Sequence, residues 1–150
     1  MGSILNENDR SAIVNRVQSL SASSTGRWGS MDVTRMLRHL RLSAQMATGD
    51  LEVPSKDKRA LQMFPLKHLL LYVLPFPKGA PTAPKLKPDV AEALSLEEER
   101  KALLELLERI AAGPRDGAGP AHPLFGPLTR REWGVATYKH MDHHLRQFGA

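Results

Sequence analysis

The chain has 150 residues, of which 41% are hydrophobic and 25% are charged, and its formal net charge is +5 at pH 7. This length suffices for one domain with a buried core, and the composition is typical of globular proteins. Because the chain contains no cysteine, disulfides and thiolate metal sites are excluded, and nitrogen and oxygen atoms must hold any metal ion.

Neither a membrane span nor a targeting segment is visible. The longest apolar stretch, LLLYVLPF (69–76), is far too short to cross a bilayer. The first residues, MGSILNENDR, lack the basic-then-apolar layout of a signal peptide. We therefore expect a cytoplasmic protein with no membrane partner, in which residues 1–150 form a single domain.

The positive charge is spread along the chain. Basic residues are interleaved with acidic ones, as in EEERKALLELLER (97–109), and the densest cluster is Arg35, Arg38 and Arg41. Their spacing predicts that these arginines form the solvated outer stripe of one helix. Nucleic-acid binding needs a continuous basic face with aromatic partners, and aromatic residues make up only 5% of the chain. We therefore expect no nucleic-acid partner.

Two helices are predicted in the first third of the chain. The first runs from about Glu7 to Leu20, with its apolar residues on one side. The second is capped by Ser30, continues to Thr48 and stops at Gly49. Its apolar residues recur at helical spacing: Val33, Met36, Leu37, Leu40, Ala44 and Ala47.

A long connection, residues 49–94, follows the second helix. It holds an apolar piece from Pro65 to Leu74 and then the run PFPKGAPTAPKLKP (75–88), whose prolines exclude regular helix and central strand. Apolar residues on both sides of this run predict an ordered or semi-ordered loop that is anchored to one core, rather than a domain linker.

The last two helices each begin with a capping box, Ser95 with Glu98 and Thr129 with Glu132. The loop between them, 113–127, is rich in glycine and proline, and strand alternation is nowhere convincing. The predicted fold is therefore all-α, a four-helix bundle with a long crossover between the second and third helices.

Three histidines lie within five positions near the end of the last predicted helix. On a helical projection His140 and His144 fall on the buried stripe one turn apart, whereas His143 points away from it. Two imidazoles in this arrangement can share one metal ion, but a third ligand must come from another helix. His39, at the edge of the second helix's apolar stripe, is the candidate. Core histidines that bond to neighbours would give the same pattern, so both interpretations stay open here.

The segments RWGSMDVTRMLRHL (27–40) and KHMDHHLRQFG (139–149) resemble the DinB-like superfamily of small bacterial four-helix bundles. HPLFGPLTRREWGVATYKHMDHHLRQFG (122–149) resembles one uncharacterised branch of it, and the likeness extends from about residue 8 onward. The resemblance implies a divalent metal site, usually for zinc or nickel, made by one histidine of the second helix and an HxxxH of the last. Those positions are His39, His140 and His144.

The resemblance also implies a function. Characterised members are metal-dependent enzymes that transfer or isomerise low-molecular-weight thiols, so the expected partner is a small-molecule substrate of this kind. No catalytic residue is assigned, because Met141 follows His140 and the general base of an HExxH motif is absent. The alternative is a metal-stabilised or metal-free helical interaction protein without catalysis.

The remaining expectations concern single side chains. Trp28 is expected to be a lid on the end of the bundle, His68 a structural residue of the crossover, and His122 an exposed loop residue. Apolar residues near the N-terminus, such as Ile4 and Ile13, exceed what one bundle needs for its core and so suggest a homodimer.

Overall fold

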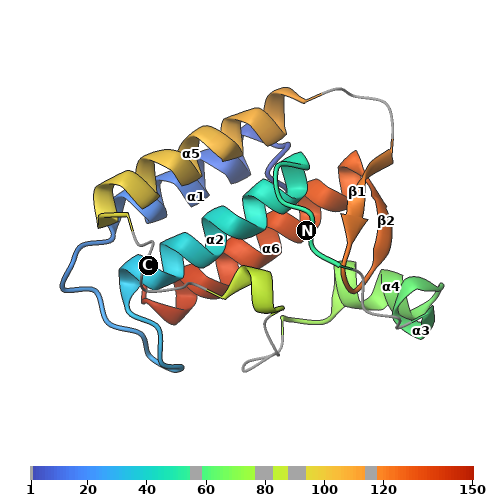
Figure 1. Cartoon of the computed structure of the whole chain (residues 1–150), viewed down its shortest axis with the longest axis horizontal. Coiled ribbons are helices and arrows are strands. Elements are labelled where there is room, and N and C mark those ends of the chain that lie inside the picture. Colours follow the sequence, from blue (N-terminus) through green and yellow to red (C-terminus); the bar gives the residue numbers. More distant parts are fainter. Residues whose placement is uncertain (1, 55–58, 77–82, 88–93, 114–117) are drawn as a thin grey trace.

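The computed structural model of the chain is mostly helical (Figure 1). It describes five stretches: residues 2–54, 59–76, 83–87, 94–113 and 118–150. Within them, four helices are long: α1 (Glu7–Ser19), α2 (Val33–Thr48), α5 (Leu96–Ala112) and α6 (Arg130–Gln147). The connection from α2 to α5 holds short helical segments: α3 (Arg59–Gln62), α4 (Leu66–His68), the π-helical η1 (Leu69–Val73) and the 3₁₀-helical η2 (Pro84–Leu86).

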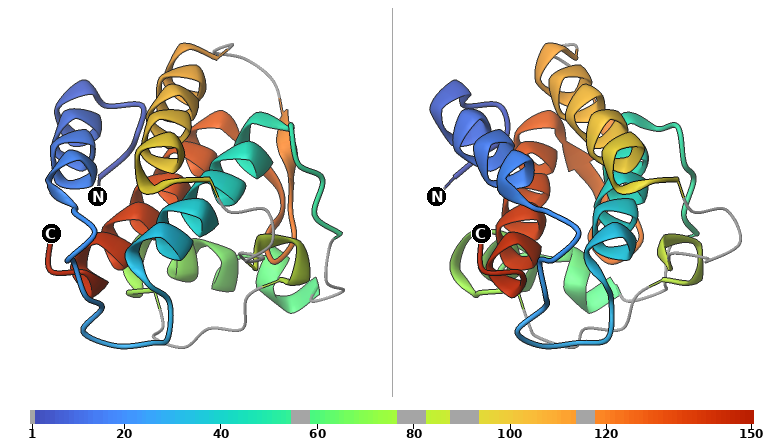
Figure 2. Two further views of the ribbon diagram at one scale, coloured as in Figure 1. Left: turned by 60° about the vertical axis from the view of Figure 1, so that its left-hand side comes forward. Right: turned by 90° about the vertical axis from the view of Figure 1, so that its left-hand side faces the viewer.

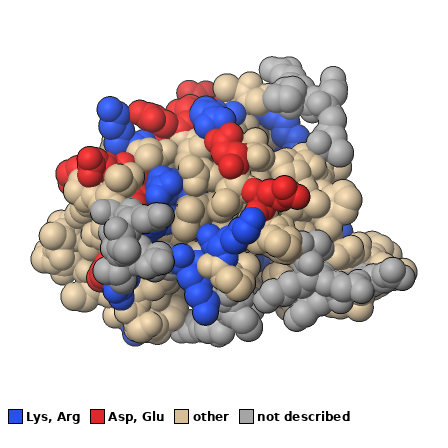
Figure 3. Space-filling view, in the orientation of Figure 1, with Lys and Arg blue, Asp and Glu red and all other residues tan. Residues whose placement is uncertain are grey.

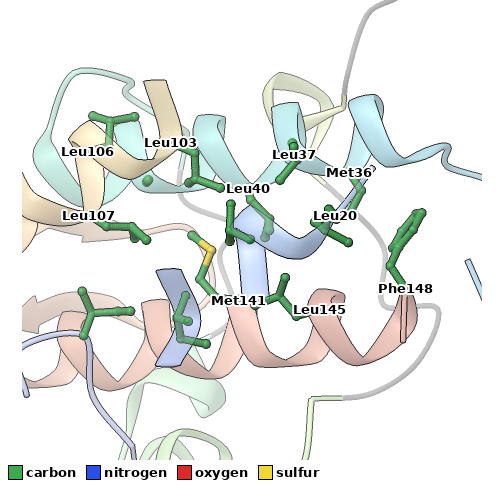
Figure 4. Packing of buried hydrophobic residues seen from close by; sticks show 14 of the residues in the cluster. Leu20, Met36, Leu37, Leu40, Leu103, Leu106, Leu107, Met141, Leu145 and Phe148 are labelled. Atoms are coloured by element: carbon green, nitrogen blue, oxygen red, sulfur yellow. The ribbon is translucent and has the colours of Figure 1, made fainter. Parts of the chain in front are cut away.

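The long helices share one hydrophobic core. α5 packs on α2 and α1 packs on α6, while α2 and α6 also contact each other (Figure 2). In Figure 4 leucines of α5, such as Leu107, point toward Leu40 of α2 and Met141 of α6, and all three side chains are fully buried. Because burying one such side chain stabilises the fold by about 2 kcal/mol, this core outweighs the surface ion pairs. The buried stripe predicted for α6 is confirmed: Trp133, Thr137, Met141, Leu145 and Phe148.

The structure confirms the predicted ends of the helices with one exception. Both capping boxes are present, Ser95 with Glu98 and Thr129 with Glu132. Ser30 is not the N-cap of α2: Asp32 is, and its carboxylate accepts a hydrogen bond from the Arg35 N–H at 2.8 Å. A carboxylate at this position also interacts favourably with the positive end of the helix dipole.

The prediction of an all-α chain without strands is wrong at one place. Residues Ala118–His122 (β1) and Gly126–Thr129 (β2) form an antiparallel hairpin that precedes α6 (Figure 1). Its register is irregular between Ala118 and Ala121, where Pro120 lies. Proline is tolerated there because the ladder is interrupted, and strands this short and poor in β-branched residues leave no alternating pattern in the sequence.

The arginines of α2 do not form the solvated stripe expected from their spacing. Arg38 is buried, and Arg41 pairs with Glu99 of α5 at 2.5 Å. Glu99 is fully buried, because α5 covers this side of α2. Periodicity places residues on one face of a helix, but it does not say which neighbour covers that face. On the side of the molecule shown in Figure 3, basic residues are interspersed with acidic ones.

The crossover is anchored at both ends of the Pro-rich run. Leu71 before the run and Leu86 within its last part are buried, in a second cluster that also contains Trp133. Residues 77–82 and 88 of the run lie outside the described part of the chain, so its order stays a prediction.

Two further expectations from the sequence concern the surface. Ile4 and Ile13 are fully buried inside the chain, which removes the reason given for a homodimer. Five large apolar side chains of the crossover and one before α5 are exposed: Met63, Phe64, Leu69, Val73, Leu74 and Leu94. No helix among the described residues has the length and apolar character needed to cross a bilayer.

Candidate metal centre

The three histidines singled out from the sequence lie together in the structure. His39 projects from α2, while His140 and His144 project from successive turns of α6. One ring nitrogen of each lies within 4.8 Å of the others, and the ring centroids are 4.8–4.9 Å apart. These three side chains are therefore close enough to hold a single metal ion.

His39 presents a lone pair to this centre. Its Nδ1 lies 2.8 Å from the backbone carbonyl oxygen of Leu86, which can only accept, so Nδ1 carries the proton and donates. In a neutral ring Nε2 is then unprotonated. The crossover thus fixes the tautomer of His39 by delivering one carbonyl group from η2.

His144 is oriented in the same way by a side chain. The amide nitrogen of Gln147 donates to the Trp28 carbonyl oxygen at 2.5 Å, so the amide oxygen faces His144. His144 Nδ1 lies 2.8 Å from that oxygen and donates to it, which leaves Nε2 with its lone pair. Gln147 is 2% exposed and is held by the segment before α2, where a side chain on Gly29 would meet the Gln147 amide at 2.7 Å. Such partners are the usual support of metal-binding histidines.

His140 completes the set. Its Nε2 lies 3.0 Å from the Nε2 of His39, and its ring stacks on Phe76 with centroids 5.3 Å apart. Two lone pairs repel at this distance, so the contact requires either a proton on His140 Nε2 or a cation shared by both nitrogens. Two nitrogen ligands of a tetrahedral zinc ion lie about 3.3 Å apart, which is close to the distance found.

The surroundings of all three imidazoles lower the pKa and so favour the neutral ring. Burial lowers the pKa of His39, and the backbone hydrogen bond to Leu86 offsets this only in part. Burial, followed by the neighbouring histidines, lowers the pKa of His140 well below its usual value. Burial also lowers the pKa of His144 to about 4. Because only the neutral ring can ligate, the environment favours metal binding over protonation.

The centre opens into a pocket of about 540 Å³. Its walls are mainly apolar and come from α2, α6, the crossover and the hairpin. Arg35, Lys87 and Lys139 contribute positive charge, which Asp32 offsets in part by its ion pair with Arg35 at 3.6 Å. None of the described residues that line the pocket is an aspartate or a glutamate. A pocket of this size and character suits a small molecule with an apolar body, and its charge favours anions.

A family model described as "Protein of unknown function (DUF1569)" matches residues 3–150. The chain belongs to the DUF1569 family. No curated protein and no solved structure matches it.

His143 of this DUF1569 protein is not one of the three convergent histidines, His39, His140 and His144, as its position on the helix predicts. It is nevertheless half-buried and lines the pocket, with its ring 5.1 Å from Phe76 and 5.9 Å from Trp28. Trp28, expected to be a lid on the end of the bundle, also lines the pocket.

The prediction for His122 is wrong. This residue is half-buried at the end of β1 and lines the same pocket as the three convergent histidines. Burial lowers its pKa to about 4. The sequence suggested an exposed loop because His122 precedes a proline in a glycine-rich segment, and nothing in that segment predicted the hairpin. His68, by contrast, is exposed and contacts Tyr72 and Phe64 of its own segment, outside the pocket.

Proposed function

We propose that this protein is a metal-dependent enzyme in which His39, His140 and His144 hold one divalent ion at the pocket. The observation that supports this most strongly is the fixed tautomer of two of the rings, whose Nδ1–H groups are occupied by Leu86 and Gln147. Unprotonated Nε2 atoms then point to one place from two helices. Imidazole ligands suit zinc and nickel among the common divalent ions, and these are the metals that we propose.

The proposed reaction is the transfer of a low-molecular-weight thiol to an electrophile, as the resemblance to the DinB-like superfamily implies. A divalent ion on three neutral ligands keeps its full charge and would stabilise a bound thiolate at neutral pH. The side chains of Arg35 and Lys87 would favour an acidic thiol, and the apolar wall would exclude water from the electrophile. The thiol would lose its S–H proton and its sulfur would form a bond to the electrophilic carbon. The π bond at that carbon would break, and its electron pair would pass to the adjoining atom, which would take up the proton.

We also propose that the four long helices form a DinB-like bundle and that the protein acts in the cytoplasm. The capped helices, the shared core and the long crossover support the first proposal. The absence of cysteine and the lack of a membrane-crossing helix among the described residues are compatible with the second.

Metal analysis and a thiol-consumption assay test this function. Protein purified without a histidine tag should contain about one zinc or nickel ion per chain, and the loaded protein should consume a cellular thiol in the presence of an electrophile. His140→Ala should lose both properties. His68→Ala is the matched control, because His68 is exposed and lies outside the pocket.

A second candidate function, an interaction protein without catalysis, is favoured by the exposed apolar side chains of the crossover. Phe64 is 83% exposed and Met63 is 64% exposed. Apolar surface of this kind often marks a contact with another protein. A chain that lacks metal and keeps its melting temperature in chelator would favour this candidate.

A further inference from the structure

The hairpin before α6 holds His122, whose ring carries its proton on the other nitrogen from the rings of His39 and His144. His122 Nδ1 lies 3.1 Å from the backbone nitrogen of Leu124 and 3.3 Å from that of Phe125. Both backbone groups are N–H donors, so Nδ1 must accept and cannot carry a proton. A neutral imidazole has one N–H group. In His122 that group is therefore Nε2–H.

The ring of His122 is also held in place. It stacks on Phe125 with centroids 4.7 Å apart and lies against Trp133 at 5.3 Å. The Trp133 indole N–H donates to the Pro120 carbonyl oxygen at 2.9 Å, which fastens the hairpin to α6. The turn closes at Gly126, whose φ of +67° is a conformation that other residues rarely adopt. His122 is thus a donor whose direction the fold has already set.

No described residue bonds Nε2 of His122, while the side chain lines the pocket that contains His39, His140 and His144. A proton added at Nδ1 would meet two N–H groups, and burial opposes the charged ring as well, so the donor stays neutral at pH 7. A neutral donor in a mainly apolar wall suits an uncharged acceptor, because a carboxylate would lose more hydration than this single bond returns.

We propose that His122 is a substrate-binding residue whose Nε2–H donates to a carbonyl oxygen of an apolar electrophile. This inference rests on the proposed function, because it takes the pocket to be the place where the substrate lies. The electrophile would be an apolar molecule with a carbonyl group, held by the hairpin while the thiol is held near the three convergent histidines. Neutral histidine donors are used in this way to orient and polarise carbonyl groups.

The first test is the tautomer itself, read from two-bond proton–nitrogen NMR spectra of the whole chain at pH 7. His122 should show a protonated Nε2 and an unprotonated Nδ1. Addition of acetophenone, a small apolar carbonyl compound, should shift the Nε2 signal of His122. A protonated Nδ1 would overturn the proposal, and so would a signal that acetophenone leaves unchanged.

The second test compares two variants and two probes. In His122→Asn the amide oxygen can still accept from the N–H groups of the turn, but the shorter side chain places no N–H group at the position of Nε2. This variant should bind acetophenone about 2- to 10-fold more weakly than the parent. It should bind ethylbenzene, which has no oxygen, equally well. Equal affinity of both proteins for acetophenone would overturn the proposal, whereas His68→Asn, the matched control, should change neither affinity.

Metal content separates the two proposals. The His122 variant should keep its zinc or nickel, since His122 is not among the convergent ligands. If the parent binds metal but acetophenone is insensitive to His122→Asn, only the inference about His122 fails. If the parent binds acetophenone through His122 but never holds a metal ion, the proposed enzyme fails and the binding site stands.

Discussion

Histidines on two sides of one pocket are held in opposite protonation patterns. On the helical side, the Nδ1 atoms of His39 and His144 donate to oxygen, so each ring offers a lone pair at Nε2. On the hairpin side, Nδ1 of His122 accepts from two backbone N–H groups, so the ring offers a proton at Nε2. The partner of its other nitrogen thus determines whether a histidine can serve as a metal ligand or as a hydrogen-bond donor.

This difference arises from the elements that carry the rings. η2 supplies a carbonyl oxygen, and the Gln147 amide of α6 supplies another acceptor. A tight turn instead presents the N–H groups of Leu124 and Phe125 to the residue that precedes it.

Removing a ligand should have the largest effect. His140→Ala or His144→Ala leaves two nitrogen ligands, and His39→Ala takes away the contribution of α2, so each variant should lose stable metal loading. Elemental analysis at equal protein concentration measures this directly, with His68→Ala as the control. Full loading of His140→Ala or His144→Ala would show that the metal lies elsewhere.

Removing the partner of His144 should have an intermediate effect. Gln147→Leu keeps the volume of the side chain but takes away the acceptor that fixes the tautomer. Metal affinity should fall about 10- to 100-fold, as measured by competition with a chromogenic chelator. Gln18→Leu, on the exposed side of α1, is the matched control. Unchanged affinity in Gln147→Leu would mean that the tautomer is set by something other than Gln147.

The hairpin histidine should make stability depend on pH. Its pKa is about 4 in the folded protein, below the usual value of 6.5, so between these values the unfolded chain binds more protons. The contribution of neutral His122 to the free energy of unfolding is therefore present at neutral pH and is lost as pH falls from 6.5 toward 4. Between pH 7 and 5 the metal-free parent should lose about 2 kcal/mol more of its unfolding free energy than His122→Asn. Urea titrations at both values measure this, and equal losses would contradict a buried neutral His122.

His143→Ala should have the smallest effect. The side chain lines the pocket but is not one of the three convergent ligands. Metal loading should therefore equal that of the parent in the same elemental analysis. Loss of the ion in His143→Ala alone would mean that the ring positions on α6 are assigned to the wrong face.

The part of the site that lies on helices could be predicted from the sequence. The spacing of His140 and His144 determines that both rings share one face of α6. The apolar residues of α2 recur at helical spacing, and this pattern places His39 at the edge of the buried stripe of α2. Capping boxes at Ser95 and Thr129 likewise fix where two helices begin. These are local rules, in which near neighbours in sequence decide the outcome.

The part that depends on distant contacts could not be predicted. Leu86 and Gln147 act through atoms that only the folded chain brings to His39 and His144. The role of His122 depends on a hairpin whose short, proline-containing strands leave no alternating pattern in the sequence. Periodicity predicts a solvated stripe for Arg41, because it does not reveal that Glu99 of α5 lies against this side chain.

The opposite tautomers can be tested in one NMR measurement, with metal-free protein and with one added equivalent of zinc at pH 7. His39 and His144 should show protonated Nδ1 in both samples, and zinc should shift their Nε2 signals. His140 should carry its proton on Nε2 without zinc and on Nδ1 with it, because its Nε2 faces that of His39. His122 should keep its proton on Nε2 throughout. A zinc-induced shift at Nε2 of His122, or unshifted Nε2 signals at His39 and His144, would contradict the account.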